Sequence, residues 1–202
     1  KQKSLSLKKM LVITNKKSSK YCIMKSNKPF DRGSLAKKIL ADSKDSIRHR
    51  KSIELNYSIR NIDRSIGASL SGEIAKMYGN HGFAETPIRL NFTGTAGQSL
   101  GVWNAGGVEI YLTGDANDYV GKGMSGGKVI IKVPDEFKTV ADKNSIIGNT
   151  CLYGATGGKL YAEGKAGERF AVRNSGAIAI VEGAGDHCCE FMTGGCSIIL
   201  GN

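Results

Sequence analysis

The chain has 202 residues, a net charge of +11 and 40% hydrophobic residues, which suits one domain or one domain plus an extension. Aromatic residues make up only 7%, so small and branched aliphatic side chains must fill most of a core. Its 27 glycines and 3 prolines indicate many tight backbone turns and argue against a disordered, low-complexity chain.

Charge and glycine are divided unevenly along the chain. Residues 1–50 carry 15 Lys or Arg against 3 Asp or Glu, whereas residues 51–202 carry 14 against 15. Residues 1–30 contain nine lysines and no acidic residue, which predicts a basic, poorly ordered extension. Binding of this extension to nucleic acid or to a membrane surface is a weaker alternative. No apolar run reaches transmembrane length, so no membrane segment is expected.

The region before residue 94 predicts a cap made of helices and strands. Residues 34–41 place apolar side chains on one helical side, and residues 71–78 predict a short helix closed by Gly79. Alternating apolar and polar residues at 53–59 and 88–92 predict two strands. We expect residues 31–80 to cover the amino-terminal end of the fold.

From Gly94 to Gly201 the chain repeats a glycine pair or Ser-Gly, a short apolar strand and another glycine. The second residues of these opening pairs are Gly107, Gly127, Gly158, Gly176 and Gly195, and the steps from one to the next are 20, 31, 18 and 19 residues. The pattern predicts strands at 108–112, 129–133, 160–162, 178–181 and 197–200. The long step contains residues 134–144, a polar stretch that predicts an inserted loop.

A period of 18–20 residues is typical of a solenoid. Leucine-rich repeats require a leucine pattern that is absent here, and helical repeats do not tolerate this glycine density. The sequence therefore predicts an all-β, single-stranded parallel solenoid, a β-helix whose strands stack in register. The expected corners of its coils are Gly107, Gly127, Gly158, Gly176 and Gly195.

Two motifs that suggest ligand binding have simpler interpretations. Residues 121–126 match Gly-x-Gly-x-x-Gly, but a β-branched strand follows where a dinucleotide site needs a helix. Asp115, Asp118 and Asp186 follow glycines in turns, and the nonapeptide repeat of calcium-binding β-rolls is absent. We expect no cofactor, metal or catalytic site in this chain.

The cysteines are Cys22, Cys151, Cys188, Cys189 and Cys196, an odd number that favours a reducing cytoplasm over a disulfide framework. Strand alternation would point Cys188 and Cys189 to opposite faces, with one of them filling the core. A structural role is favoured, with metal binding and catalysis as alternatives. A free-standing enzyme using Cys188 or His187 is the lowest-ranked hypothesis.

Residues 168–174 carry Arg169 and Arg173, which would point to one face of a strand. An anion site is one interpretation of these cations. We favour either a salt-bridged face or a docking surface for another domain, formed by Glu168, Arg169 and Arg173.

Several ordered segments resemble the carboxyl-terminal, glycine-rich (GXGXG) domain of the glutamate synthase large subunit. These segments are residues 59–64, 70–74, 93–101, 114–127, 147–150, 152–158, 166–176 and 181–187. The resemblance covers residues 31–202 and implies a right-handed parallel β-helix. Residues 1–30 resemble nothing that we can place.

The resemblance also implies a function. Glutamate synthase forms glutamate from glutamine and 2-oxoglutarate with an amino-terminal cysteine, FMN and an iron–sulfur cluster, and this chain lacks the residues for all three. The resemblance implies a non-catalytic scaffold, with FMN and the cluster on amidotransferase and FMN-binding partners. The alternatives are a stand-alone scaffold or binding module from a split gene, and a role like that of the β-helix subunit of formylmethanofuran dehydrogenase.

Overall fold

The computed structural model describes residues 6–12, 31–79, 82–137 and 143–201. Most of the expected basic extension, and Cys22 with it, lies outside these residues. The chain divides into two units, residues 1–31 and 32–202. In the first unit, the Met10 and Leu11 backbone N–H groups donate hydrogen bonds to the Leu7 carbonyl. The second unit holds the helices and strands described below.

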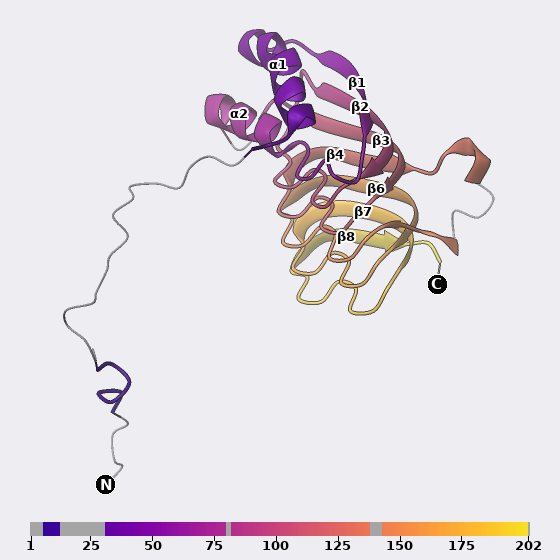
Figure 1. Cartoon of the computed structure of the whole chain (residues 1–202). Coiled ribbons are helices and arrows are strands. Elements are labelled where there is room, and N and C mark those ends of the chain that lie inside the picture. The colour runs from indigo at the N-terminus through magenta and orange to yellow at the C-terminus, as the bar shows by residue number, and fades with distance from the viewer. Residues whose placement is uncertain (1–5, 13–30, 80–81, 138–142, 202) are drawn as a thin grey trace. The chain divides into compact units, whose positions relative to one another are not determined.

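Two helices form the amino-terminal cap of the second unit, as the sequence predicted. Helix α1 (Ser34–His49) is longer than expected and ends at Arg50. Helix α2 (Ala68–Tyr78) ends at Gly79, whose N–H donates to the Ala75 carbonyl. Figure 1 shows both helices beside the end of the sheet at which the first strand lies.

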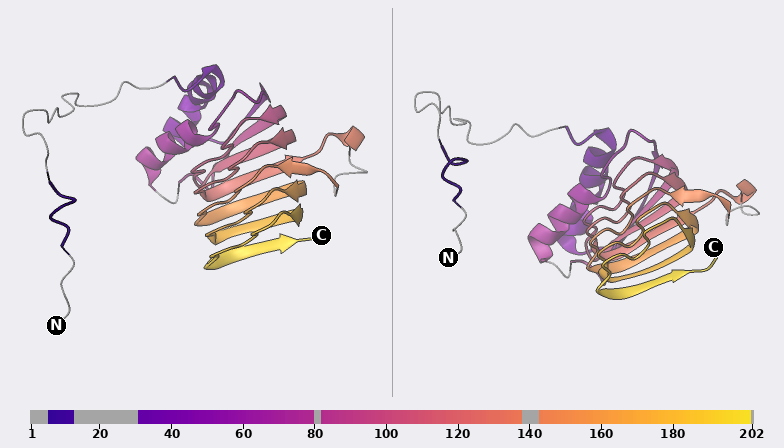
Figure 2. Two further views of the ribbon diagram at one scale, coloured as in Figure 1. Left: turned by 60° about the horizontal axis from the view of Figure 1, so that its bottom comes forward. Right: turned by 90° about the horizontal axis from the view of Figure 1, so that it is seen from below.

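In the described part of the chain, eight strands form one parallel sheet, with the order β1-β2-β3-β4-β6-β7-β8, and β5 pairs with β3 and β6. Figure 2 shows the strands side by side, joined by long connections. The strands are β1 (Ile53–Ile59), β2 (Ile88–Ala96), β3 (Val108–Ala116), β4 (Ser125–Lys132), β5 (Ser145–Ile147), β6 (Gly157–Ala166), β7 (Ser175–Ala184) and β8 (Gly194–Ile199). A mostly parallel, all-β fold with a helical cap is therefore confirmed.

The core consists of inward-pointing residues that are in register from strand to strand. One such row is Leu55, Leu90, Ile110, Val129, Leu160 and Ala179. From Leu90 to Ala179 the side chains in this row are fully buried. Aliphatic side chains dominate the row, as the low aromatic content required.

Predicted strand boundaries differ from the observed ones in two ways. The sequence placed strand ends at Gly114, Gly164 and Gly183, but these glycines lie inside β3, β6 and β7. Strand β5 was not expected; it follows the long loop and pairs with both neighbouring repeats. Glycine tolerates an irregular strand conformation as well as a turn, so its position alone does not mark a strand end.

The connections contain a second regular element, which we call the turn stack. It consists of residues 98–103, 118–123, 149–154, 168–173 and 186–191. In each turn the second, fourth and sixth residues have positive φ. Their N–H groups bond to neighbouring turns in both directions: Tyr119 donates to Asn149 at 2.9 Å, and Gly121 donates to Leu100 at 2.9 Å. These bonds hold non-glycine residues in a left-handed conformation that costs roughly 1–2 kcal/mol each.

Candidate docking surface on the outer face of the sheet

Outward-pointing residues alternate with the core rows and are also in register. One outward row is Glu54, Arg89, Glu109, Lys128, Lys159, Ile178 and Cys196. The next is Asn56, Asn91, Tyr111, Ile130, Tyr161, Ile180 and Ile198. Both rows change from polar to apolar along the sheet. We call residues 54, 56, 89, 91, 109, 111 and 128 the outer polar half, and residues 130, 161, 178, 180, 198 and 200 the outer apolar half.

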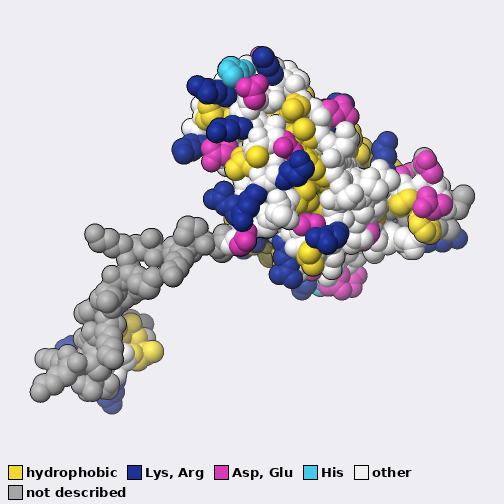
Figure 3. Space-filling model, turned by 45° about the horizontal axis from the view of Figure 1, so that its top comes forward, with side chains coloured by type: hydrophobic (Ala, Val, Ile, Leu, Met, Phe, Trp, Pro, Cys, Tyr) yellow, Lys and Arg dark blue, Asp and Glu magenta, His cyan; other side chains and the backbone are white. Residues whose placement is uncertain are grey.

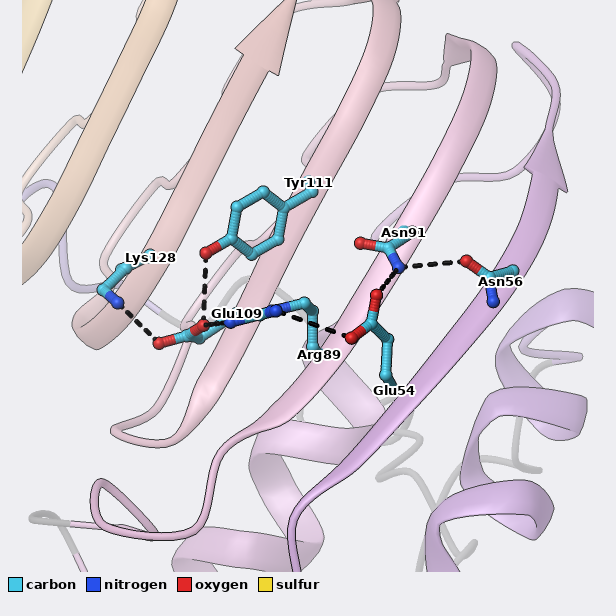
Figure 4. A network of polar contacts seen from close by, with 7 residues as sticks. All are labelled: Glu54, Asn56, Arg89, Asn91, Glu109, Tyr111 and Lys128. Atoms are coloured by element: carbon cyan, nitrogen blue, oxygen red, sulfur yellow. Dashed lines mark hydrogen bonds and ion pairs between the residues drawn. The ribbon is translucent and has the colours of Figure 1, made fainter.

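The charged groups of the outer polar half pair with one another, as Figure 4 shows, although Arg89 Nε is buried without a hydrogen-bond partner. Glu109 lies at its centre: its carboxylate accepts a hydrogen bond from Lys128 Nζ at 2.7 Å and from Arg89 Nη2 at 3.4 Å. Arg89 also lies 3.5 Å from Glu54, whose carboxylate accepts a bond of 2.7 Å from Asn91. Paired charges of this kind are stable in water without a partner.

The ionisation of Glu109 depends on this network. Burial alone would raise the pKa of its carboxyl, but hydrogen bonds and attraction from Lys128 and then Arg89 outweigh burial and hold the pKa below its ordinary value. Because the folded pKa is lowered, the carboxylate stabilises the fold at neutral pH. That contribution is lost as the pH falls below about 4.5 and through the folded pKa.

We expect Glu109→Gln to lower the free energy of unfolding by about 1 kcal/mol at pH 7, because Arg89 and Lys128 stay partly exposed and are screened. The difference from the parent should be smaller at pH 3, because the Glu109 carboxylate takes up a proton as the pH falls through its lowered folded pKa. Urea unfolding followed by circular dichroism at both pH values measures it. The exposed Glu85, changed to Gln, is the matched control and should differ little from the parent at either pH. A loss of unfolding free energy for Glu109→Gln that is as large at pH 3 as at pH 7 would contradict the stabilising role of the Glu109 carboxylate.

The outer apolar half leaves large side chains in water. Ile178 is 40% exposed, Ile198 is 42% exposed and Leu200 is 68% exposed. A shallow hollow of about 380 Å³ is lined by Ile130, Tyr161, Ile180 and Leu200 together with Lys132, Glu163 and Glu182. One carboxylate oxygen of Glu163 is buried there without a hydrogen-bond partner. A group of exposed, large apolar side chains is typical of an interaction site.

Sequence reasoning missed the outer apolar half, although a signal was present. Uninterrupted apolar runs lie at 129–131 in β4, at 177–181 in β7 and at 198–200 at the end of β8 and just beyond it. Continuous runs are typical of parallel strands that are buried on both faces. The inner face of these strands meets the core, and the outer face has no cover within the described part of the chain.

The predicted docking residues Glu168, Arg169 and Arg173 lie in the turn stack. The expectation that they lie on a strand was wrong, because Arg169 and Arg173 have positive φ within a turn. All three are exposed, and Arg169 lies 3.6 Å from Glu168. The Arg173 guanidinium lies 6.0 Å from the Tyr153 ring of the adjacent turn. Their role in docking stays a prediction.

The five predicted corner residues lie where strands begin. Gly107 directly precedes β3, Gly127 is the third residue of β4, and Gly158, Gly176 and Gly195 are the second residues of β6, β7 and β8. Gly107, Gly127, Gly158 and Gly195 have positive φ. At Gly176, a Cβ atom would lie 2.2 Å from the Thr156 carbonyl oxygen, so close approach of the backbone accounts for this glycine. Their role as coil corners stays a prediction.

The Gly-x-Gly-x-x-Gly segment and the turn aspartates Asp115 and Asp118 are accounted for by the structure around them. Strand β4 follows Gly121 and Gly123, so no helix stands where a dinucleotide site would need one. Asp118 Oδ1 accepts a hydrogen bond of 2.8 Å from the Asn149 N–H of the next turn. Asp115 Oδ1 accepts one of 2.8 Å from Thr95 Oγ1. These aspartates therefore join neighbouring repeats.

The expectation that Cys188 and Cys189 point to opposite faces was wrong. Both pack against the core, and their sulfurs lie 3.4 Å apart. Strand alternation does not apply, because these residues form a turn in which Cys189 has a positive φ. Cys151 is fully buried, and burial raises the pKa of its thiol to about 12, which suits a structural cysteine.

The surface of the helical cap carries charged side chains of both signs, unlike the outer apolar half. Figure 3 shows acidic and basic side chains lying among one another on the face turned forward. On α1, Lys38 Nζ lies 2.8 Å from the Asp42 carboxylate, which also accepts a hydrogen bond from Tyr57 Oη. The net positive charge of the described cap is therefore partly balanced within α1.

Comparison with known proteins identifies the family of this chain. A family model described as the GXGXG motif matches residues 34–202. The chain belongs to the GXGXG family. It is 56% identical over 165 residues to ferredoxin-dependent glutamate synthase 2 of Synechocystis sp., and 50% identical over 164 residues to the glutamate synthase [NADPH] large chain of Bacillus subtilis. Each match covers 81% of this chain.

This GXGXG chain matches only a small part of those relatives. It spans 10% of the Synechocystis protein and 11% of the Bacillus subtilis protein. A match to ferredoxin-dependent glutamate synthase 1 of Arabidopsis thaliana likewise covers 10% of that protein, at 53% identity. No helix in the described part of the chain is long and apolar enough to cross a membrane.

Proposed function

We propose that this chain is the non-catalytic GXGXG part of a glutamate synthase, wound as a right-handed parallel β-helix, which scaffolds the catalytic parts. The observation that carries the proposal is the outer apolar half, which lies uncovered on a family member that spans a tenth of its relatives' length. Residues 31–202 form the scaffold in this proposal, and residues 1–30 are an extension to it.

The right-handed winding is supported by the regularity of the repeats. Successive core residues Ile110 and Val129 are 19 residues apart in sequence and directly paired in the sheet, as are Leu160 and Ala179. Each parallel pair needs a connection that returns to the same end of the sheet. Such connections are right-handed in nearly all proteins, because right-twisted strands favour that crossover.

The scaffold role is supported by the division of the outer face. The outer polar half pairs its charges internally, whereas the outer apolar half gains free energy only when another surface removes it from water. Register fixes the spacing of Ile130, Tyr161 and Ile180, because each is paired through the backbone with the next. The partner therefore meets a surface of fixed shape. In this proposal Glu168, Arg169 and Arg173, in the turn stack, add polar contacts to a partner.

The proposed partners are the amidotransferase and FMN-binding parts of glutamate synthase, as domains or as separate chains in the cytoplasm. FMN and the iron–sulfur cluster bind to those parts in this proposal. The contribution of this chain is positional: it holds two catalytic regions at a set separation. It adds no group to the glutamine or 2-oxoglutarate chemistry.

A chimaera tests the proposal. Residues 32–202 replace the matching segment of the Bacillus subtilis large chain, and glutamate formation is measured with the purified enzyme. We expect the chimaera to be active and Ile180→Asp within it to lose at least tenfold in activity, because a carboxylate would be buried at the interface.

The matched control is Thr113→Asp, which changes an exposed residue on the outer face of β3, in register with Lys132. This variant should retain the activity of the chimaera. Thermal unfolding of both variants in the isolated chain separates docking from folding. Equal activity of the Ile180→Asp and Thr113→Asp chimaeras would remove the outer apolar half from the proposal. Glutamate formation by the isolated chain would end the scaffold assignment.

A further inference from the structure

A pair of adjacent thiols lies at the far end of the turn stack from the helical cap. Cys188 and Cys189 belong to the last turn, residues 186–191, and their Sγ atoms are 3.4 Å apart. Both are half-buried, and neither takes part in the outer face of the sheet.

The positions of these cysteines explain why both sulfurs point inward. The N–H of Cys189 donates to the Phe170 carbonyl at 2.8 Å, and the N–H of Ala171 donates to the Cys151 carbonyl at 2.9 Å. Cys188 thus follows Cys151 and Phe170 in the stack, and Cys189 follows Ala171. Those three residues are fully buried. The last turn has no further turn beyond it among the described residues, so its two inward sulfurs remain reachable from solvent.

A disulfide suits this pair poorly. Adjacent α-carbons joined by a trans peptide are about 3.8 Å apart, whereas disulfides usually span about 4.4–6.8 Å between α-carbons. The bond would be strained and easily reduced. Two neighbouring thiols that resist pairing are instead free to bind one soft ion together, because thiolate sulfur prefers soft partners.

The distance between the two sulfurs favours an ion with a particular coordination geometry. With metal–sulfur bonds of about 2.3 Å, a linear ion would need sulfurs about 4.6 Å apart, whereas a separation of 3.4 Å corresponds to a bond angle of about 95°. An angle near 90° is that of a pyramidal trivalent ion with a lone pair. A tetrahedral metal is disfavoured, because the described residues contain no group of three or more His, Cys, Asp or Glu side chains that could hold one.

We propose that Cys188 and Cys189 form a bidentate site for a trivalent arsenical or a similar pyramidal thiophile. With an organic arsine oxide, two S–H bonds break and two As–S bonds form, and the oxygen leaves with both protons as one water. Arsenic stays trivalent, so the step needs no oxidant or reductant.

The local environment sets how the site responds to pH. Burial, followed by the hydrogen bond with Cys189, raises the pKa of the Cys188 thiol to about 12. The Cys188 thiol is therefore protonated at neutral pH and is a weak nucleophile toward alkylating agents. Chelation depends on two sulfurs acting together and does not need a free thiolate beforehand.

Phenylarsine oxide tests the site on the full chain, kept reduced. After excess 2-mercaptoethanol has removed arsenic held by single thiols, mass spectrometry under native conditions should show one arsenical per chain. Cys188→Ser and Cys189→Ser should each lower the retained arsenical at least tenfold. Cys196→Ser removes an exposed cysteine on β8 and is the matched control, which should retain it fully. Retention by Cys188→Ser would overturn the proposal.

A second measurement distinguishes the folded site from two neighbouring thiols in an unfolded chain. A ligand that binds the folded state preferentially raises the unfolding temperature. Phenylarsine oxide should therefore raise the unfolding temperature of the parent and of Cys196→Ser, and leave that of Cys188→Ser unchanged. An arsenical that binds the parent and lowers its unfolding temperature would show that the native geometry is not the binding geometry, and the proposal would fail.

Discussion

Gly114→Ala should abolish the cooperative fold of residues 32–202. Gly114 lies in the middle of β3 with a φ of 143°, a conformation in which side chains are strained. An added Cβ would lie 1.9 Å from the carbonyl oxygen of Gly94 on the adjacent strand. The two glycines are paired in register, so neither strand can shift without breaking its pairing with the other. We expect a loss of at least about 4 kcal/mol, which is comparable to the whole stability of many domains.

The control for this prediction is Gly72→Ala. Gly72 lies on the exposed side of α2, and an added Cβ meets nothing within 4 Å. Alanine favours the helix there, so the free energy of unfolding should rise by about 0.5–1 kcal/mol. Urea unfolding followed by circular dichroism measures both variants. A Gly114→Ala protein with the same midpoint as the parent would show that β2 and β3 do not approach each other this closely.

Phe170→Ala should be the most damaging change to the core. Phe170 lies in the turn stack, is 0% exposed and is among the largest fully buried side chains. Its removal leaves a cavity between Cys151 and Cys188, and the hydrogen bonds of the turns above and below limit collapse into it. We expect the free energy of unfolding to fall by about 3–5 kcal/mol.

Phe191→Ala tests whether burial is the cause. Phe191 lies in the last turn of the stack and is 75% exposed. Its removal should change the free energy of unfolding by less than about 0.5 kcal/mol. Equal losses for the two phenylalanines, measured by urea unfolding under the same conditions, would contradict the burial of Phe170.

The sequence located most strands because it carries two signals, each of which marks a different part of the sheet. Alternation at Ile53, Leu55 and Tyr57 predicted β1, and the repeated glycines predicted the strands from β3 to β8 apart from β5. Strand β5 was missed because its three residues carry no periodic pattern. Helix α1 extends to His49 because its polar second half buries Ser43 and Ser46, which a search for apolar residues does not detect.

The turn stack could not be predicted from the sequence. Its left-handed positions include Thr150, Leu152 and Arg169, residue types that rarely adopt positive φ on their own. Hydrogen bonds from neighbouring turns enforce the conformation, and such bonds exist only after the repeats have stacked. The paired orientation of Cys188 and Cys189 depends on this conformation and was mispredicted for the same reason. The outer apolar half was predictable in principle, because its runs match those of strands covered on both faces.

The long step between β4 and β6 shows how this architecture accommodates extra chain. Val129 and Leu160 are 31 residues apart in sequence, yet they pair as closely as residues one ordinary repeat apart. After the inserted loop, strand β5 pairs with β3 and β6 and returns the chain to the sheet. The added residues therefore leave the neighbouring repeats aligned. A change of chain length at this point therefore need not alter how the strands on either side pair with one another.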